Sequence, residues 1–240
     1  MIVMAYVRLE VRRTLRDTGF VAFGIGMPVV MYLLFTNLGT DAAEWKTASM
    51  VAMAAYGALG AALSTGTGIA EDKGAGWLRQ LRVTPMTPRQ VVAGRALTGS
   101  VVVLPAIAAV LAAGALVNGV RLHAWQWAAV ALALWLGAVP FTLLGMGNGY
   151  RLSAQTTGLV NMGCNLLLSI VGGLWFPVEL FPRWLRSLSA LTPTHRFAEI
   201  GQSLAAGAAP AAAAVAVIAA WALLFGSYAV LSYRRSARTV

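Results

Sequence analysis

The sequence contains little charge, and acidic residues are especially few. Of 240 residues only 11% are charged, with 8 Asp or Glu against 18 Lys or Arg, whereas 59% are hydrophobic and the mean hydropathy is +0.73. An ordinary soluble domain carries about 25% charged residues. A soluble fold of this length could not cover so much apolar surface with so few charges, so a soluble enzyme is excluded. The composition is that of an integral membrane protein.

The excess of basic residues, a net charge of +10, does not indicate a nucleic-acid partner. Basic residues that bind nucleic acid gather on one solvated face. Here they stand in short groups between apolar runs, which is the distribution that sets membrane topology. No nucleic acid is therefore expected among the partners.

Motifs for catalysis, metal binding and ATP hydrolysis are also lacking. Cys164 is the single cysteine, which excludes an intrachain disulfide, and the two histidines, His123 and His195, are isolated from each other. The sequence contains neither a His-Glu-x-x-His metal motif nor a Gly-x-Ser-x-Gly nucleophile motif. The phosphate-binding pattern Gly-x-x-x-x-Gly-Lys-Ser/Thr is absent too. We therefore expect no catalytic residue, no metal and no cofactor in this chain.

What the sequence does contain is a series of long apolar runs. A helix needs roughly 20 apolar residues to cross a bilayer core. Runs of sufficient length that lack Asp, Glu, Lys and Arg are 18–40, 47–70, 96–120, 122–150, 152–178 and 200–233. The last run is longer than a crossing requires, so we place its span near 212–232. The predicted fold is all-α, with six transmembrane helices in a single domain over 1–240.

Lysine and arginine are concentrated on one side of this predicted topology. Six spans place both termini on the same side as Arg151 and the loop at 71–95. That side carries 13 of the 18 basic residues, and the opposite side carries the other 5. Because basic residues accumulate in cytoplasmic loops, both termini are expected to be cytoplasmic. The abundance of Ala, Gly and Arg favours a high-GC bacterium and hence its cytoplasmic membrane.

Two segments outside the spans are amphipathic. Residues 1–18 interleave apolar side chains with four arginines, which predicts an interfacial helix lying on anionic membrane lipids; a topology anchor alone would have the same charges. Residues 177–208 show helical spacing of apolar residues on the external side. Pro177, Pro182 and Pro193 would break this segment into short helices that are interfacial or re-entrant.

Polar residues within the spans are uncharged and follow two stripes. One stripe runs along the second span through Ser64 and its neighbouring glycines, and the other runs along the fifth span. Such stripes must face protein or water rather than lipid. Close helix packing explains them, and a translocation path between two subunits is the sharper alternative. The candidate path residues are Ser64, Thr157, Asn161, Asn165 and Ser169.

The loop at 71–95 reads EDKGAGWLRQLRVTPMTPRQVVAGR. It resembles the loop between the second and third spans of ABC-2 type permeases, the membrane subunits of bacterial ABC exporters that include the daunorubicin-resistance type. In these proteins an acidic residue ends the second span, and a glycine, a short apolar-basic helix and a Thr-Pro-Met turn follow. The external segment fits the same family, with Phe176-Pro177, Trp184-Leu185 and Thr192-Pro193 in order. The resemblance covers essentially the whole chain.

The resemblance implies the permease subunit of an ATP-driven exporter. The expected partners are a second permease copy, identical or a close paralogue, and a separate nucleotide-binding subunit that holds ATP and Mg²⁺ and performs the hydrolysis. The expected cargo is an amphipathic drug, lipid or secondary metabolite, which would connect the protein with drug or antibiotic resistance. The residues expected to couple the permease to its ATPase are Glu71, Gly74, Trp77, Leu78, Leu81, Arg82, Thr84, Pro85, Met86 and Arg89.

The chemistry of the loop favours the coupling role independently. Leu78 and Leu81 lie on one side of a short predicted helix, and arginines lie on the other. Apolar anchors supply affinity for a groove on a partner, and basic residues orient the docking. The same arginines could also serve topology alone. Glu71 is expected to pair with Arg12 or Arg13 as a pivot at the end of the second span.

Two other functions stay open at this stage. A gradient-driven secondary transporter would need an ionisable group, for which Glu71 and Asp72 are the candidates. A non-transporting membrane scaffold would predict that changes at Asn161 or Asn165 affect folding alone.

Overall fold

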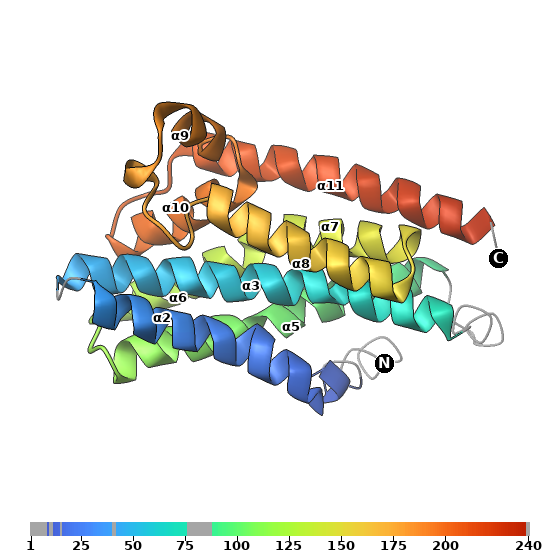
Figure 1. Ribbon diagram of the computed structural model, residues 1–240, viewed down its shortest axis with the longest axis horizontal. Coiled ribbons are helices and arrows are strands. Elements are labelled where there is room, and N and C mark those ends of the chain that lie inside the picture. Colours follow the sequence, from blue (N-terminus) through green and yellow to red (C-terminus); the bar gives the residue numbers. More distant parts are fainter. Residues whose placement is uncertain (1–8, 10–11, 15, 40–41, 76–87, 239–240) are drawn as a thin grey trace.

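All regular secondary-structure elements in the described part of the chain are helices. The computed structural model describes residues 9, 12–14, 16–39, 42–75 and 88–238, with side chains from 95 to 236 in the last range. No strand occurs within these ranges, and the long helices run side by side (Figure 1). The chain is an all-α integral membrane protein, as predicted. Its long helices are η1 (Phe20–Gly26, a π-helix) continuing into α2 (Met27–Leu38), α3 (Ala43–Gly74), α5 (Pro88–Leu116), α6 (Ala124–Gly137), α7 (Val139–Arg151), α8 (Ala154–Val171) and α11 (Ala212–Arg238).

Several helices are long and apolar enough to cross a membrane. Within the described residues these are Phe20–Leu38, Ala43–Gly74, Arg95–Leu116, Ala124–Arg151 and Ala212–Ser236. They correspond to the first four predicted spans and the sixth. The predicted fifth span, 152–178, contains α8, whose 18 residues extend about 27 Å but are more polar. The chain is thus multi-pass, and the crossing by the predicted fifth span remains a prediction.

The central helix of the bundle is α3. Within its apolar window 72% of the residues are buried, against 17% for the first span and 11% for the last. It packs against α2, α5, α7, α8 and α10. Its sequence explains this position, because a run of Ala and Gly lets neighbouring backbones approach closely.

The fourth predicted span is broken into two helices. Pro140 lacks an N–H and would clash with the carbonyl four residues earlier in a continuous helix. α6 therefore ends at Gly137, and α7 begins at Val139. Together they still form one crossing of 28 residues.

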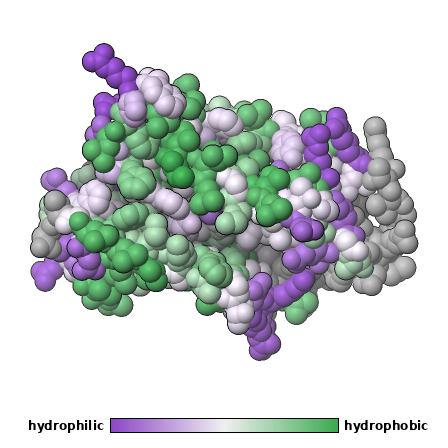
Figure 2. Space-filling view, viewed as in Figure 1, coloured by the Kyte–Doolittle hydropathy of each residue, from purple (hydrophilic) through white to green (hydrophobic). Residues whose placement is uncertain are grey.

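The direction of the helices places basic residues at two opposite ends. The start of η1, the end of α3 and the end of α11 lie at the same end of the bundle (Figure 1). Those basic residues of the predicted cytoplasmic set that the structure describes therefore lie at this end of the bundle. The face in Figure 2 is mainly apolar between the two ends. Exposed apolar side chains of α8 and α11, such as Leu159, Leu167, Leu223 and Leu231, suit contact with lipid.

The segment 177–208, which is predicted to be external, consists of short helices that start at prolines, as expected. They are η2 (Val178–Leu180) after Pro177, α9 (Arg183–Ser189) after Pro182, and α10 (Pro193–Ala205). α9 is peripheral, whereas α10 packs against α3, α6 and α11. Phe197 of α10 is 1% exposed, and its ring lies 5.5 Å from that of Phe141. α10 is therefore part of the helix bundle.

The predicted N-terminal interfacial helix lies mostly outside the described residues. Residues 9, 12–14, 16, 18 and 19 are helical. At its junction with the first span the Asp17 carboxylate accepts hydrogen bonds from the backbone N–H groups of Gly19 (2.8 Å) and Phe20 (3.2 Å). Asp17 therefore stabilises the backbone at the point where the first span begins.

His195 on α10 is predicted to make the stability of the protein depend on pH. Burial lowers the pKa of His195, and the Arg196 guanidinium lowers it further, while the carboxylates of Glu199 and Glu179 and the backbone of Gly172 raise it. The unfolded chain therefore binds a proton at a higher pH than the folded chain. Stability should fall as pH drops below about 6.5, by at most about 1.4 kcal/mol per pH unit.

Unfolding titrations with SDS at pH 7.5 and pH 5.5 would test this expectation. His195→Gln should remove much of the difference between the two pH values. Equal pH dependence in the wild type and the His195 variant would contradict the assignment.

Candidate functional site

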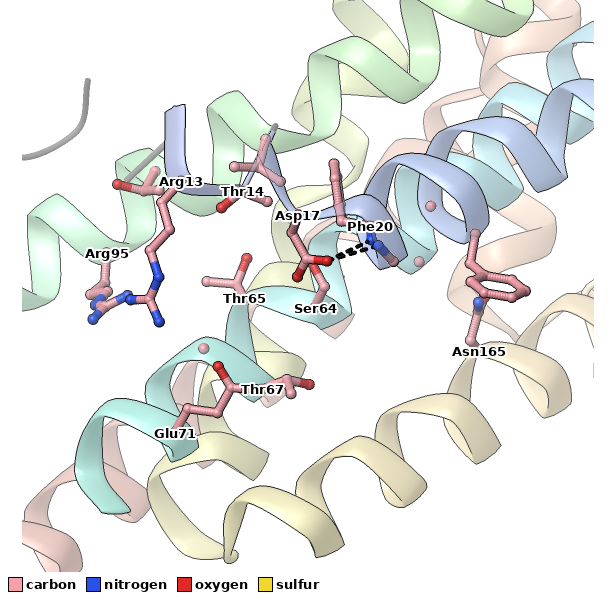
Figure 3. Close-up of a pocket in the computed structure, with 17 residues that line it drawn as sticks. Arg13, Thr14, Asp17, Phe20, Ser64, Thr65, Thr67, Glu71, Arg95 and Asn165 are labelled. Carbon is pink, nitrogen blue, oxygen red and sulfur yellow. Dashed lines mark hydrogen bonds between the residues drawn. The ribbon is translucent and has the colours of Figure 1, made fainter. Parts of the chain in front are cut away.

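A cavity of about 440 Å³ lies between the N-terminal segment, η1, α3, α5 and α8 (Figure 3). It extends along α3 from Gly60 to Glu71, a rise of about 16 Å. Phe20 and Phe23 give it an aromatic wall. The polar residues that line it, with hydroxyl, amide or carboxylate groups, are Thr14, Asp17, Ser64, Thr65, Thr67, Glu71, Thr98 and Asn165. Such a lining can accept a molecule with both an apolar body and polar groups.

Asp72 joins three segments beside this cavity. Its carboxylate pairs with Arg95 of α5 and, at 3.3 Å, with Nη1 of Arg13 in the N-terminal segment. The side chains of Arg95 and Asp72 are only 7% and 15% exposed, whereas Arg13 is 58% exposed. Arg95 and Arg13 also line the cavity. The ionic cluster of Arg13, Asp72 and Arg95 therefore ties together the two ends of the 71–95 segment.

Glu71 occupies a different position from the predicted one. The structure pairs Arg13 with Asp72 rather than with Glu71. Glu71 is exposed and lines the cavity, and it forms no ion pair within the described part of the chain. Adjacent helical residues point about 100° apart. This explains how the Asp72 carboxylate reaches α5 while the Glu71 carboxylate faces the cavity.

Lys73 connects the end of α3 to the end of α7. Its Nζ donates hydrogen bonds to the backbone carbonyls of Gly149 (3.3 Å), Tyr150 (3.0 Å) and Leu152 (2.7 Å). The last carbonyls of a helix have no partner within it, and a cation is favoured there. Lys73 thus serves as a side-chain cap, in addition to any role in topology.

Asn161 belongs to a buried network between helices. Its Nδ2 donates to the Leu63 carbonyl of α3 (2.8 Å), and its Oδ1 accepts from Nδ2 of Asn148 on α7 (2.8 Å). Asn148 in turn accepts from the hydroxyl of Tyr228 on α11 (2.9 Å). This network joins α3, α7, α8 and α11, so within this protomer Asn161 has a packing role.

The other predicted path residues divide between packing and the cavity. Thr157 is fully buried and donates to the Ser153 carbonyl (2.8 Å), while Ser169 is fully buried and lies 3.4 Å from Oδ1 of Asn165. Ser64 and Asn165 both line the cavity. The structure therefore brings Ser64, Asn165 and Glu71 together.

Most of the predicted coupling residues lie outside the described residues. Glu71 and Gly74 are described at the end of α3. Arg89 lies in α5, where only the backbone is described. The remainder fall outside: Trp77, Leu78, Leu81, Arg82, Thr84, Pro85 and Met86. Their coupling role stays a prediction.

The sequence reasoning overlooked Thr65, Thr67 and Thr98, which line the cavity, and the pairing of Asp72 with Arg95. A signal was present for one of them, because positions 64, 67 and 71 recur at helical spacing on one face of α3. No group of three or more His, Cys, Asp or Glu within the described ranges is placed to bind a metal ion.

Asn161 and Asn165 are expected to differ in their effects on stability. Asn161→Ala leaves the Asn148 amide without its buried acceptor, which should cost about 1–3 kcal/mol. Asn165→Ala removes only the long contact with Ser169 and should cost much less. SDS unfolding titrations would measure both, and an equal loss of stability in the two variants would contradict the separation of roles.

Comparison with known proteins agrees with this architecture. A model of the ABC-2 type transporter family matches residues 2–204. This chain belongs to the ABC-2 type transporter family. The ABC-2 chain is also 26% identical over 221 residues, 90% of both chains, to "Putative transport permease YvfS" of Bacillus subtilis (strain 168).

Family membership and the membrane-spanning helices together define the general function. The protein is a multi-pass transport permease of the ABC-2 family. The family predicted from the 71–95 loop and the external segment is thus confirmed. Its assignment to the daunorubicin-resistance type remains a prediction.

Proposed function

We propose that this ABC-2 permease is the membrane subunit of an ATP-driven exporter. A separate nucleotide-binding subunit holds ATP and Mg²⁺ and docks on the 71–95 segment. Movement of that segment on ATP binding opens and closes the path, as expected for an equilibrium biased by a ligand. The termini and the 71–95 segment lie on the cytoplasmic side of a bacterial membrane.

The observation that carries this proposal is the position of the ionic cluster. Arg13, Asp72 and Arg95 connect the N-terminal segment to both ends of the proposed docking segment. Arg13 and Arg95 also border the cavity that contains Ser64 and Asn165. A displacement of the segment by a partner would therefore reach the cavity through residues already in contact.

The cavity also supports the proposed cargo. Its aromatic residues suit an apolar body, and its hydroxyl and amide groups suit a few polar substituents. An amphipathic drug, lipid or secondary metabolite has this chemistry. Two permease copies would enclose a path between them, with the cavity of each copy at its entrance.

Affinity purification of the tagged chain from its host in mild detergent tests the coupling. We expect a protein with the Gly-x-x-x-x-Gly-Lys-Ser/Thr motif to co-purify and to be lost from a Leu78→Asp, Leu81→Asp variant. The matched control is Leu180→Asp, Leu188→Asp, which introduces the same charges at exposed leucines of the external segment. Retention of the ATPase by the first variant would contradict docking at 71–95.

A gradient-driven transporter is the second candidate, favoured by the Glu71 carboxylate, which lines the cavity and forms no ion pair within the described ranges. Uptake into inverted vesicles separates the two candidates. Transport that requires ATP and persists in Glu71→Gln supports the exporter. Transport driven by a proton gradient without ATP, and abolished in Glu71→Gln, supports the alternative. Wild-type vesicles that transport none of the amphipaths supplied, with or without ATP, would favour the scaffold.

A further inference from the structure

A second cavity, of about 350 Å³, lies at the opposite end of the bundle from the ionic cluster. We call it the outer pocket. It is formed by the end of α2, the first part of α3, the connection from α8 to η2, and α10. Four aromatic side chains, Phe35, Trp45, Trp175 and Phe176, line it.

A hydrogen bond and contacts between rings fix the positions of the aromatic side chains of the outer pocket. Nε1 of Trp45 donates a hydrogen bond to the Phe35 carbonyl (3.1 Å). The ring of Phe176 lies 6.5 Å from that of Phe35, and the ring of Trp175 meets Tyr56 edge-on at 5.6 Å. The connection that carries Trp175 and Phe176 begins at Gly173, whose φ of +74° favours glycine. The rings are thus positioned before any ligand arrives.

The charge of the outer pocket is negative. Glu179 lines it, and no ion pair involves its carboxylate in the part of the chain that the structure describes. Among the residues that the structure describes, neither a Lys nor an Arg lines the pocket. The guanidinium of Arg186 donates to the backbone carbonyl of Glu179 instead, and Arg196 pairs with Glu199 at 2.7 Å.

The remaining polar groups of the pocket are uncharged. His195, Gln202 and Ser49 lie on its lining. Burial lowers the pKa of His195, so its imidazole is neutral at pH 7 and adds no positive charge. Among the described residues of the lining, Glu179 is therefore the one that carries a formal charge at pH 7.

We propose that the outer pocket binds an organic ammonium group. Aromatic faces attract a cation through their quadrupole, and most strongly where the cation has shed water. An unpaired carboxylate at the edge of the same pocket adds a direct electrostatic attraction. The volume suits a small ammonium head with part of its apolar body. This site is separate from the cavity beside the ionic cluster and does not rest on the proposed ATP-driven export.

The ammonium group could belong to a free amphipathic molecule or to the headgroup of a membrane lipid such as phosphatidylethanolamine. The chemistry of recognition is the same in both cases. The two sources differ in whether the lipid competes with a soluble probe.

Equilibrium dialysis of labelled benzyltrimethylammonium against the full chain in lipid-free detergent micelles tests the proposal. We expect saturable binding that weakens about tenfold in Glu179→Gln. Phe176→Leu, which keeps an apolar side chain at this half-exposed position but removes the aromatic face, should weaken it several-fold. Glu44→Gln is the matched control, because this exposed carboxylate lies at the start of α3 outside the lining and forms no ion pair within the described ranges, and binding should be unchanged.

The proposal is overturned if binding is not saturable, or if Glu179→Gln binds as tightly as Glu44→Gln. It is also overturned if the uncharged analogue neopentylbenzene competes as well as the ammonium probe does. Competition by phosphatidylethanolamine but not by phosphatidylglycerol would identify a lipid headgroup as the occupant. Absence of such competition would identify a free ammonium compound.

Discussion

Replacing Asp72 with asparagine is expected to reduce the free energy of unfolding by about 3–5 kcal/mol. The guanidinium of Arg95 is 7% exposed and pairs directly with the Asp72 carboxylate. Removing that negative charge takes from a largely buried cation the carboxylate with which it pairs, so the cost of removing the cation from water is offset less well. Arg13 also loses its contact with Asp72, but it is 58% exposed, so its share of the effect is small.

SDS unfolding titrations of Asp72→Asn beside Glu71→Gln would measure this effect. The two substitutions are adjacent and isosteric, but Glu71 is exposed and forms no ion pair in the described ranges, so its variant should change stability by less than about 0.5 kcal/mol. Equal effects of the two substitutions would show that the pairing with Arg95 contributes nothing.

A double substitution separates the lost pairing from other damage at this position. In Asp72→Asn, Arg95→Met the buried cation is removed together with its partner, and an apolar side chain of similar length replaces it. Because removing both partners of a buried pair is far less costly than removing one, the double variant should be more stable than Asp72→Asn alone. Additive losses would contradict an interaction between the two residues.

The helices and their order could be predicted from the sequence because apolar runs of membrane length have few alternatives in a membrane protein. The start of the last span at Ala212 and the proline-delimited helices after Pro177 and Pro182 agree with the sequence prediction. Proline acts locally, through its missing N–H and its ring, so its effect can be assigned without knowledge of the fold. The break between α6 and α7 at Pro140 has the same cause, although it was not predicted.

Contacts between helices could not be predicted in the same way. Whether Glu71 or Asp72 meets Arg95 depends on the rotation of α3 about its axis, and one residue changes that rotation by about 100°. The stripe of the fifth span was recognised, but only the structure separates Asn161, bonded to α3 and α7, from Asn165 on the cavity. The coupling residues from Trp77 to Met86 lie outside the described residues and depend on the sequence alone.

Replacing Gly66 with alanine is expected to separate α3 from α7 and to destabilise the fold. A β-carbon at Gly66 would overlap the backbone carbonyl of Gly145 and would lie 3.1 Å from Nδ2 of Asn161. The close approach of the two helices is also seen from α7, because a β-carbon at Gly145 would lie 2.7 Å from the Leu63 carbonyl oxygen of α3. A backbone carbonyl cannot rotate away as a side chain can, so the two helices must move apart.

Inserting a methylene into a packed core costs roughly 1–3 kcal/mol, so Gly66→Ala should lower the free energy of unfolding by at least this amount. The hydrogen-bond network through Asn161 should be disturbed as well. The matched control is Gly158→Ala on α8, where an added β-carbon meets no atom within 4 Å. That variant should be neutral or slightly stabilising, because alanine is favoured over glycine in a helix by up to about 1 kcal/mol. SDS unfolding titrations of the two variants should therefore shift in opposite directions or differ by several-fold in size. Similar shifts for both would mean that α3 and α7 do not make a close backbone contact at Gly66.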